Sequence, residues 1–161
     1  MSRILADDKN KITLTNRRAF ADYEILERFE AGVVLHGTEV KSLRQGRASF
    51  KDSYARIINE ELWIVNFHIS PYDHGGYANH DPLRQRKLLL HKYEIRRLIG
   101  KVEERGLTLV PLRVYFKKGR VKMELALARG KKVYDKRDDI SKRDMARDTQ
   151  RELKNKYRIK I

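Results

Sequence analysis

Three segments of the chain alternate apolar and polar residues with a period of two. They cover residues 63–69, 110–116 and 121–127, and in each of them every second residue is apolar. This period is typical of strands that bury one face. The last two segments are separated by a short polar stretch in which Gly119 can adopt the positive φ of a tight hairpin. We therefore expect an antiparallel hairpin here.

Two more segments, Tyr23 to Phe29 and Tyr54 to Ile58, also have the composition of strands. The second of them is joined through the polar turn 59–61 to the segment 63–69, which predicts another antiparallel pair. The total is then five or six short antiparallel strands. Sheets of this kind close into a barrel or pack as a sandwich, because closure removes exposed edges. We expect a mainly β protein built as a barrel.

Two helices are expected between the strands. The longer one follows residues 91–94, which resemble a capping box, and it ends before Gly106. Its residues Ile95, Leu98, Ile99 and Val102 recur at the spacing of one helix face. The shorter helix is predicted from Thr38, as the N-cap, to Gly46. It would bury Val40 and Leu43 and expose Lys41 and Arg44.

A domain boundary is expected near Gly130, because all glycines and prolines lie at or before it. Residues 1–130 would form the barrel. Residues 131–161 form a basic tail with twelve Lys and Arg against six Asp and Glu. Its thin apolar stripe is Met145, Leu153, Tyr157 and Ile161. So little apolar surface cannot offset the entropy of ordering, so we expect this tail to be disordered when free and helical against a phosphate-rich surface.

Charge indicates the class of partner. The 161 residues carry 37 Lys and Arg against 22 Asp and Glu, a formal charge of +15. A small protein with so large a positive charge attracts polyanions, of which nucleic acid is the commonest. Because no recognition helix for double-stranded DNA can be identified, we expect RNA recognised by its shape. The chain contains no cysteine and no apolar run near the ~18 residues of a spanning helix. These features favour the cytoplasm and argue against a membrane.

Evidence for catalysis is weak. The densest set of histidines, His68, His74 and His80 with Asp81, has six-residue intervals interrupted by two glycines, which is not the spacing of a metal site. Phosphate-binding glycine loops and nucleophile-elbow motifs are absent from the sequence. We therefore expect neither a metal, a cofactor nor an enzyme.

Several long motifs in this sequence closely resemble the bacterial SmpB family of SsrA-binding proteins, which act in trans-translation. They are Glu30–Arg44 (EAGVVLHGTEVKSLR), Asp52–Tyr54 (DSY), Asn79–Pro82 (NHDP), Arg86–His91 (RKLLLH) and Gly130–Arg137 (GKKVYDKR). The resemblance covers nearly the whole chain. One small departure is Asn59-Glu60 at a turn where the family commonly has Gly-Glu.

The resemblance implies a barrel similar to the oligonucleotide-binding fold and surrounded by helices. It also implies that the protein is an adaptor whose barrel binds the tRNA-like domain of transfer-messenger RNA (tmRNA, or SsrA RNA). Glu30, Leu89 and Lys122 match family positions important for this contact. Supporting contacts would come from Asn16, Arg17, Lys41, Arg44, Arg84, Arg86 and Lys87. Cations can neutralise phosphates, a leucine can pack on a base or ribose, and a carboxylate can accept hydrogen bonds from base edges.

The resemblance also implies a role for the tail at the ribosome. Gly130 would act as a hinge, and residues near the decoding centre would be Lys131, Lys132, Tyr134, Asp135, Lys136 and Arg137. Arg143, Arg147 and Arg151, spaced four apart, would follow ribosomal RNA along the vacant mRNA channel. The partners are then tmRNA, the 70S ribosome, and elongation factor Tu with GTP, with the protein acting as a monomer.

Two alternatives remain open at this point. One is a ribosomal protein whose basic tail is threaded permanently through ribosomal RNA. The other is an RNA-processing nuclease that uses His80 and Asp81.

Overall fold

The computed structural model describes residues 11–73, 76, 79–131 and 133–159. The chain divides into two compact units between Arg129 and Gly130. Each unit is treated by itself below.

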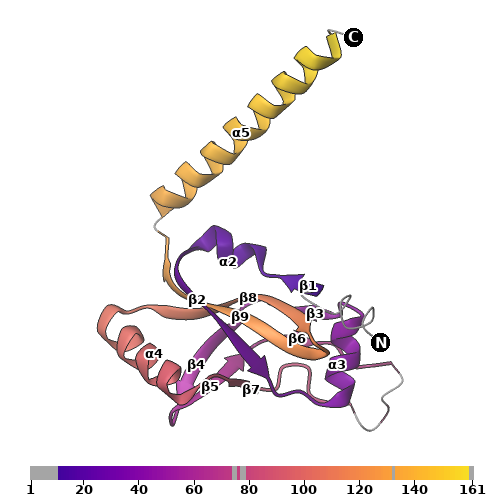
Figure 1. Ribbon diagram of the computed structural model, residues 1–161, viewed down its shortest axis with the longest axis vertical. Helices are drawn as coiled ribbons and strands as arrows, with labels where there is room; N and C mark the ends of the chain where they lie inside the picture. Colours follow the sequence, from indigo (N-terminus) through magenta and orange to yellow (C-terminus); the bar gives the residue numbers. More distant parts are fainter. Residues whose placement is uncertain (1–10, 74–75, 77–78, 132, 160–161) are drawn as a thin grey trace. The chain divides into compact units, whose positions relative to one another are not determined.

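The first unit is built on a closed antiparallel barrel (Figure 1). The strands of its main sheet are β1 (Lys11–Thr15), β2 (Tyr23–Val33), β4 (Tyr54–Ile58), β5 (Glu61–Val65), β7 (Arg86–Leu89), β8 (Thr108–Lys117) and β9 (Arg120–Gly130). Their order is β1-β8-β4-β5-β7-β2-β9, and β9 also pairs with β8. That pairing closes a ring of six strands, to which β1 adds through β8. The short strands β3 (Ala48–Ser49) and β6 (His68–Ile69) pair with each other. The predicted mainly β, antiparallel class is confirmed, with more strands in the described part of the chain than the expected five or six.

Both predicted hairpins are present. Lys117 pairs with Arg120 across the β8–β9 turn, and the two turn residues have φ values of 52° and 73°. Ile58 pairs with Glu61 across the β4–β5 turn, where the φ values are 50° and 62°. Two consecutive positive φ angles match the right-handed twist of the strands, which is why such turns join hairpins.

A β-bulge changes which side chains share a face of β8. The register shifts between Pro111 and Arg113. As a result, Val114 and Phe116 point into the barrel core. Val110 and Leu112 belong instead to a smaller cluster with Ala19 on the other side of the sheet. The prediction that residues 110–116 bury a single face is therefore wrong, because the extra residue of a bulge reverses the alternation.

The predicted strand over residues 63–69 is also two elements. The chain leaves β5 at Asn66, which has a φ of 61°, and then forms β6. Within β5 the fully buried residues are Leu62 and Ile64, whereas Trp63 is only partly buried. Val65, Phe67 and Ile69 are buried, as the period of two predicts, whereas Trp63 at the start of the same series is not, because the turn at Asn66 shifts the alternation by one residue.

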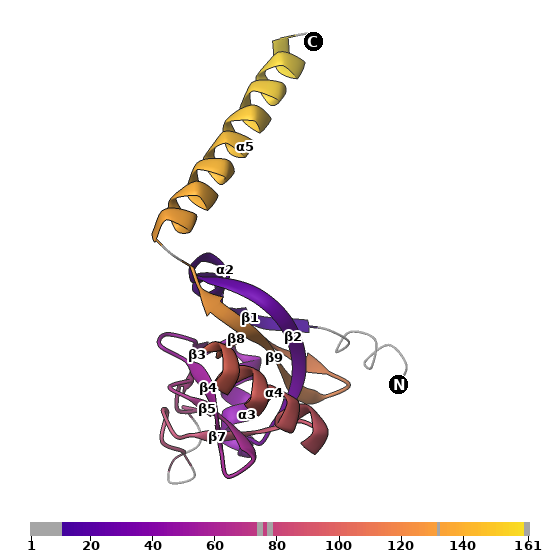
Figure 2. The same cartoon turned by 90° about the vertical axis from the view of Figure 1, so that its left-hand side faces the viewer.

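Helices α2 (Arg17–Asp22), α3 (Gly37–Arg44) and α4 (Lys92–Arg105) surround the barrel (Figures 1 and 2). Helix α2, which the sequence did not predict, covers the outer cluster around Ala19. Helix α4 buries its predicted stripe and ends at Gly106, whose φ is 61°. Its N-cap residue His91 makes no side-chain capping bond, so the capping box expected there does not form.

Helix α3 begins at Gly37, earlier than predicted, with His36 as its N-cap. The backbone N–H of His36 donates to Glu39 Oε1 at 2.8 Å. Leu43 is buried, Val40 packs against the core, and Lys41 and Arg44 are exposed as predicted. A glutamate three residues into the helix therefore fixes its start.

The second unit is one long helix, α5 (Val133–Ile159). Glycine and proline are absent from this sequence, which permits an uninterrupted helix. The apolar side chains described on it are exposed: Ile140 by 57%, Met145 by 71% and Leu153 by 49%. Within the described residues, no helix of the protein combines the length and the low polarity needed to cross a membrane.

Candidate RNA interface

Glu30 lies at the centre of a charged cluster on the outside of the barrel. Its neighbour Ala31 is fully buried, so strand alternation directs Glu30 outward from β2. The Tyr115 hydroxyl donates a hydrogen bond to Glu30 Oε2. Lys117 Nζ lies 3.3 Å from Oε1 and 3.4 Å from Oε2. Together these contacts hold a carboxylate on a surface that is otherwise cationic.

A cleft of about 420 Å³ opens beside this carboxylate. It is lined by Glu30, Lys117, Lys118, Arg120 and Lys122. Lys122 faces Tyr115 across the β8–β9 ladder, between the buried residues Val121 and Met123. Lys122 therefore points outward, as the alternation over residues 121–127 predicts. The cleft thus combines four cations with one anion.

The charge of Glu30 follows from its neighbours. The Tyr115 hydrogen bond lowers the pKa of Glu30 below its ordinary 4.5, and the charges of Lys117 and Lys122 add to this effect against an opposing effect of burial. Burial, followed by the hydrogen bond to Glu30, raises the pKa of Tyr115. At neutral pH the phenol therefore keeps its proton and Glu30 is ionised. An ionised carboxylate can only accept hydrogen bonds.

Leu89 extends the same face. Its side chain is 53% exposed at the end of β7, and it lies over Gly32 of β2, to which it is paired. A Cβ atom on Gly32 would be 3.4 Å from Leu89 Cβ, so the glycine leaves room for this leucine. Residues 30 and 32 share one face of β2, and residues 87 and 89 share one face of β7. Lys87 Nζ lies 3.2 Å from Glu61 Oε1.

We call this surface the outer wall of the barrel. It consists of Glu30, Lys87, Leu89, Lys117, Lys118, Arg120 and Lys122. The structure thereby brings together the three positions that the sequence matched first, Glu30, Leu89 and Lys122.

The two exposed cations of α3 contact aromatic rings. Lys41 Nζ lies 5.3 Å from the centre of the Tyr72 ring. Arg44 Cζ lies 4.7 Å from the centre of the Phe116 ring. Because Phe116 directly precedes Lys117 in β8, Arg44 is close to the end of the strand that carries part of the outer wall.

Arg84 and Arg86 converge on the buried Glu39. Arg86 is fully buried, and its guanidinium pairs with Glu39 and donates to the backbone carbonyls of Phe67, Arg84 and Pro82. Arg84 Nε donates to Glu39 Oε1 at 3.1 Å. The two arginines, which we expected to support the RNA contact, are thus directed to a buried carboxylate. The burial of Arg86 contradicts a direct contact with RNA, and the remaining exposure of Arg84 is small because its guanidinium is engaged with Glu39.

These contacts determine the charge of the buried carboxyl. Burial by itself raises the pKa of Glu39, but hydrogen bonds from Arg84, the His36 N–H and Arg86 outweigh it and hold the pKa below the ordinary 4.5. Burial lowers the pKa of Arg86, and the pair with Glu39 opposes that change. The cluster is therefore a charged network inside the fold, where each group depends on its partners.

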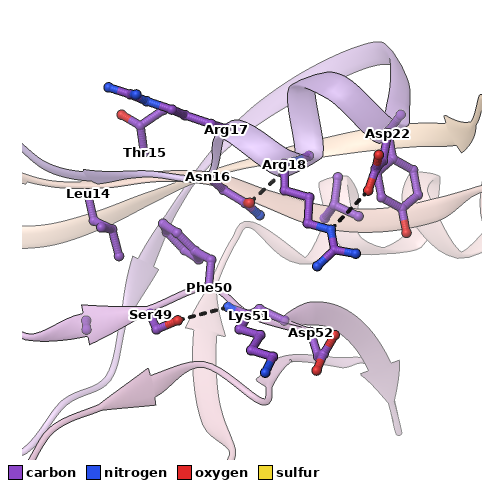
Figure 3. Close-up of a pocket in the computed structure, with 15 residues that line it drawn as sticks. Leu14, Thr15, Asn16, Arg17, Arg18, Asp22, Ser49, Phe50, Lys51 and Asp52 are labelled. Atoms are coloured by element: carbon purple, nitrogen blue, oxygen red, sulfur yellow. Dashed lines mark hydrogen bonds and ion pairs between the residues drawn. The ribbon is translucent and has the colours of Figure 1, made fainter. Parts of the chain in front are cut away.

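Asn16 and Arg17 lie at the start of α2, beside a cleft of about 510 Å³ (Figure 3). Asn16 Oδ1 accepts from the Ala19 N–H at 3.3 Å, and its Nδ2 donates to the Pro111 carbonyl at 2.8 Å. Both polar atoms of this side chain thus support the fold. Arg17 is exposed where it lines this cleft, whereas Arg18 reaches Asp22 at 3.3 Å.

The predicted tail residues divide into described and undescribed ones. Gly130 is exposed at the end of β9, and Lys131 is partly buried. The side chains of Arg137, Arg143, Arg147 and Arg151 are exposed on α5. Lys132 and the side chains of Tyr134, Asp135 and Lys136 lie outside what the structure describes.

The histidine that a nuclease would need has another role. His80 Nε2 lies 2.9 Å from the Ile69 carbonyl, so this nitrogen donates, and Nδ1 then accepts from the Thr38 hydroxyl at 3.3 Å. Asp81 Oδ1 accepts from the Leu83 N–H at 3.0 Å. Among the described residues, no three His, Asp or Glu side chains are arranged to hold a metal ion. The geometry favours a structural role for His80 and Asp81.

Five residues of this region were not identified as site residues from the sequence: Lys117, Lys118, Arg120, Tyr115 and Glu39. Tyr115 alternates with buried residues on β8, which could have placed it outside, but its partner Glu30 is 85 positions away. Glu39 is the single acid in a short basic helix, and this contrast was the only feature of the sequence that could have indicated a special role for it.

Comparison with known proteins agrees with this geometry. The family model described as SmpB protein matches residues 13–155. The chain is 58% identical over 147 residues to the SsrA-binding protein of Carboxydothermus hydrogenoformans, covering 91% of this chain and 99% of the relative. It is 59% identical over 152 residues to that of Desulforudis audaxviator, covering 94% and 99%.

A solved chain gives the same result. It comes from a structure described as "tmRNA-SmpB: a journey to the center of the bacterial ribosome". The two chains are 61% identical with a TM-score of 0.64, and the match covers 74% of this chain and 85% of the other. The chain described here belongs to the SmpB protein family.

Proposed function

We propose that this protein is an RNA-binding adaptor of trans-translation. It binds the tRNA-like domain of tmRNA and delivers this RNA to stalled ribosomes, so that nascent chains are tagged for degradation. Support comes from relatives named SsrA-binding protein and from a similar solved chain in a structure described as tmRNA-SmpB in the bacterial ribosome. In this role the protein makes and breaks no bond, and it is not an enzyme.

The outer wall is the observation that carries the proposal. It presents five cations, one oriented carboxylate and one exposed leucine on adjoining strands. Lysine and arginine neutralise phosphates, Leu89 packs on a base or ribose, and Glu30 accepts hydrogen bonds from base edges or hydroxyls. We propose Lys41, Arg44 and Arg17 as further contacts. Asn16 and Arg84 support the fold around them, and Arg86 is excluded by its burial.

The tail, in this proposal, tests whether the mRNA channel is empty. An intact message occupies the same volume, so sterics would restrict the tail to stalled ribosomes. Gly130 is the hinge, and the proposed contacts at the decoding centre are Lys131, Lys132, Tyr134, Asp135, Lys136 and Arg137. Arg143, Arg147 and Arg151 follow ribosomal RNA. The protein acts in the cytoplasm as a monomer, together with elongation factor Tu and GTP.

Changing Lys122 to Ala tests the outer wall. The variant should bind the tRNA-like domain more weakly, and a plot of log affinity against log salt should become shallower by about one unit if Lys122 neutralises one phosphate. The measurement is filter binding with purified tmRNA between low and physiological salt.

Arg56→Ala is the matched control. Arg56 is an exposed cation on β4, which lies opposite β2 in the six-strand ring, and no ion pair of Arg56 is found within the described residues. Its removal should leave both affinity and salt slope close to those of the native protein. An unchanged slope in the Lys122 variant, or an equal loss in both variants, contradicts the assignment of the outer wall.

A further inference from the structure

We propose that Tyr115 is a positioning residue that holds the Glu30 carboxylate in one orientation, so that Glu30 accepts hydrogen bonds from the RNA and thereby contributes to RNA specificity. This proposal rests on the proposed function, because it concerns how the same surface distinguishes one RNA from another. Tyr115 itself acts through Glu30 and need not touch the RNA.

The first step is the geometry around Glu30. Tyr115 donates to Oε2, and Lys117 lies within 3.4 Å of both oxygens. A free glutamate on a surface has three rotatable bonds, and ordering it costs side-chain entropy. Tyr115 and Lys117, both on β8, order the Glu30 side chain before any RNA binds, so this entropy is not lost on binding. The carboxylate is then already oriented when the ligand arrives.

The second step is why Tyr115 is a firm anchor. Its neighbours Val114 and Phe116 are buried in the barrel core, and the strand that carries Tyr115 is paired with β9. The phenol is therefore supplied by a rigid element close to the tight β8–β9 turn. The pKa of Tyr115 lies above its ordinary value, so the hydroxyl remains a donor throughout the physiological range.

The third step is what the oriented carboxylate can select. Glu30 lines a cleft whose other members are Lys117, Lys118, Arg120 and Lys122. An ionised carboxylate repels phosphate and accepts only from donors, such as base N–H groups or a ribose hydroxyl, while the cations attract phosphate. The cleft thus fits a donor group flanked by backbone phosphates. Phosphate contacts alone carry no such information.

Tyr115→Phe separates this idea from general binding, because it removes one hydroxyl and keeps the ring. We expect affinity for the tRNA-like domain to fall about fivefold to tenfold, in the range of one ordinary hydrogen bond. Affinity for bulk tRNA and the salt slope should stay unchanged, since no cation is lost. Tyr54→Phe is the control: Tyr54 is an exposed tyrosine on β4 with no hydroxyl bond found among the described residues.

A double-mutant cycle with Glu30→Ala supplies a readout that a structural role would not move. If Tyr115 works through Glu30, the Tyr115→Phe substitution should change affinity less than twofold when Glu30→Ala is already present. An equal loss in both backgrounds, or an equal loss for bulk tRNA, overturns the proposal.

The free protein gives an independent arm. In a carbon-13 titration of the Glu30 carboxyl, Tyr115→Phe should move its pKa upward, toward the ordinary 4.5. An unchanged titration overturns the positioning role. If the native protein shows no preference for the tRNA-like domain over bulk tRNA, the proposed function fails, whereas the coupling of Tyr115 to Glu30 is still decided by this titration.

Discussion

Glu39 is the residue on which the interior charges depend. It is fully buried, and it receives hydrogen bonds from Arg84, Arg86 and the N–H of His36. These contacts tie the start of α3 to the segment that leads into β7. Removing one member of a buried ion pair leaves the other charge without compensation, which costs far more than the pair contributes when it is intact.

We therefore expect Glu39→Gln to destabilise the protein by about 3 kcal/mol or more, because the buried Arg86 loses its counter-charge. Urea unfolding followed by tryptophan fluorescence measures this loss. Glu61→Gln breaks the exposed pair with Lys87 and serves as the control, with an expected cost of about 0–1 kcal/mol. A loss in the Glu39 variant as small as in the control would show that the network contributes little.

The same carboxyl makes stability depend on pH. Its pKa in the folded protein lies below the ordinary 4.5, so folding favours the ionised form. Stability from this group is then complete above about pH 4.5 and is lost as the pH falls through the lower, folded-state pKa. In Glu39→Gln the decline in acid should be shallower. It should not vanish, because the pKa values of Glu27 and Glu30 are lowered as well.

Strands β2, β4, β5, β8 and β9 and helix α4 could be predicted because their signal is local. An apolar period of two or an i, i+3, i+4 stripe is written within ten residues of sequence. The bulge before Arg113 and the turn at Asn66 could not be predicted in this way, since one extra residue or one positive φ reverses the phase without changing the composition.

Side-chain contacts between distant parts of the chain were the other limit. Arginine is usually a surface residue. The burial of Arg86 is stable because its charge is paired with that of Glu39, 47 positions away. The hydrogen bond between Tyr115 and Glu30 could not be predicted for the same reason, because the two residues are 85 positions apart. Of the outer wall, Glu30, Lys87, Leu89 and Lys122 were therefore predicted from the sequence. The other three cations, and the contact between Tyr115 and Glu30, were not.

The described side chains of helix α5 do not stabilise it by burial. Every side chain described on it is exposed, so it lacks the packing that stabilises most helices in proteins. Arg143, Arg147 and Arg151 repel one another at i, i+4 spacing. A partner rich in phosphate would remove that repulsion, which is why the helix should be firmer on RNA than in the free protein.

Ala146→Pro tests whether the helix itself is needed. Proline inside a helix costs about 3 kcal/mol and breaks the hydrogen-bond ladder. Binding of tmRNA should stay within twofold of native, while tagging of nascent chains on stalled ribosomes should fall strongly. Ala146→Ser keeps the ladder and is the control. Normal tagging by the proline variant would mean that the tail acts as an extended chain.

The two units carry their charge separately. Residues 131–161 have a net charge of +6, from twelve basic and six acidic residues, and residues 1–130 have +9, from twenty-five and sixteen. The outer wall belongs entirely to the barrel unit, whereas Arg143, Arg147 and Arg151 belong to α5. In the proposed function, this separation would allow the barrel to hold one RNA while the tail probes another.

Deleting residues 131–161 tests this division. The described core of the first unit is built from residues between Leu14 and Ala128, so the thermal midpoint of the truncated protein should stay close to that of the full chain. Affinity for the tRNA-like domain should change little at physiological salt, where long-range attraction by the lost charges is screened. Tagging of stalled chains should be abolished. A large loss of affinity for the tRNA-like domain would instead place part of that contact on the tail, and the barrel could no longer be regarded as the complete RNA-binding unit.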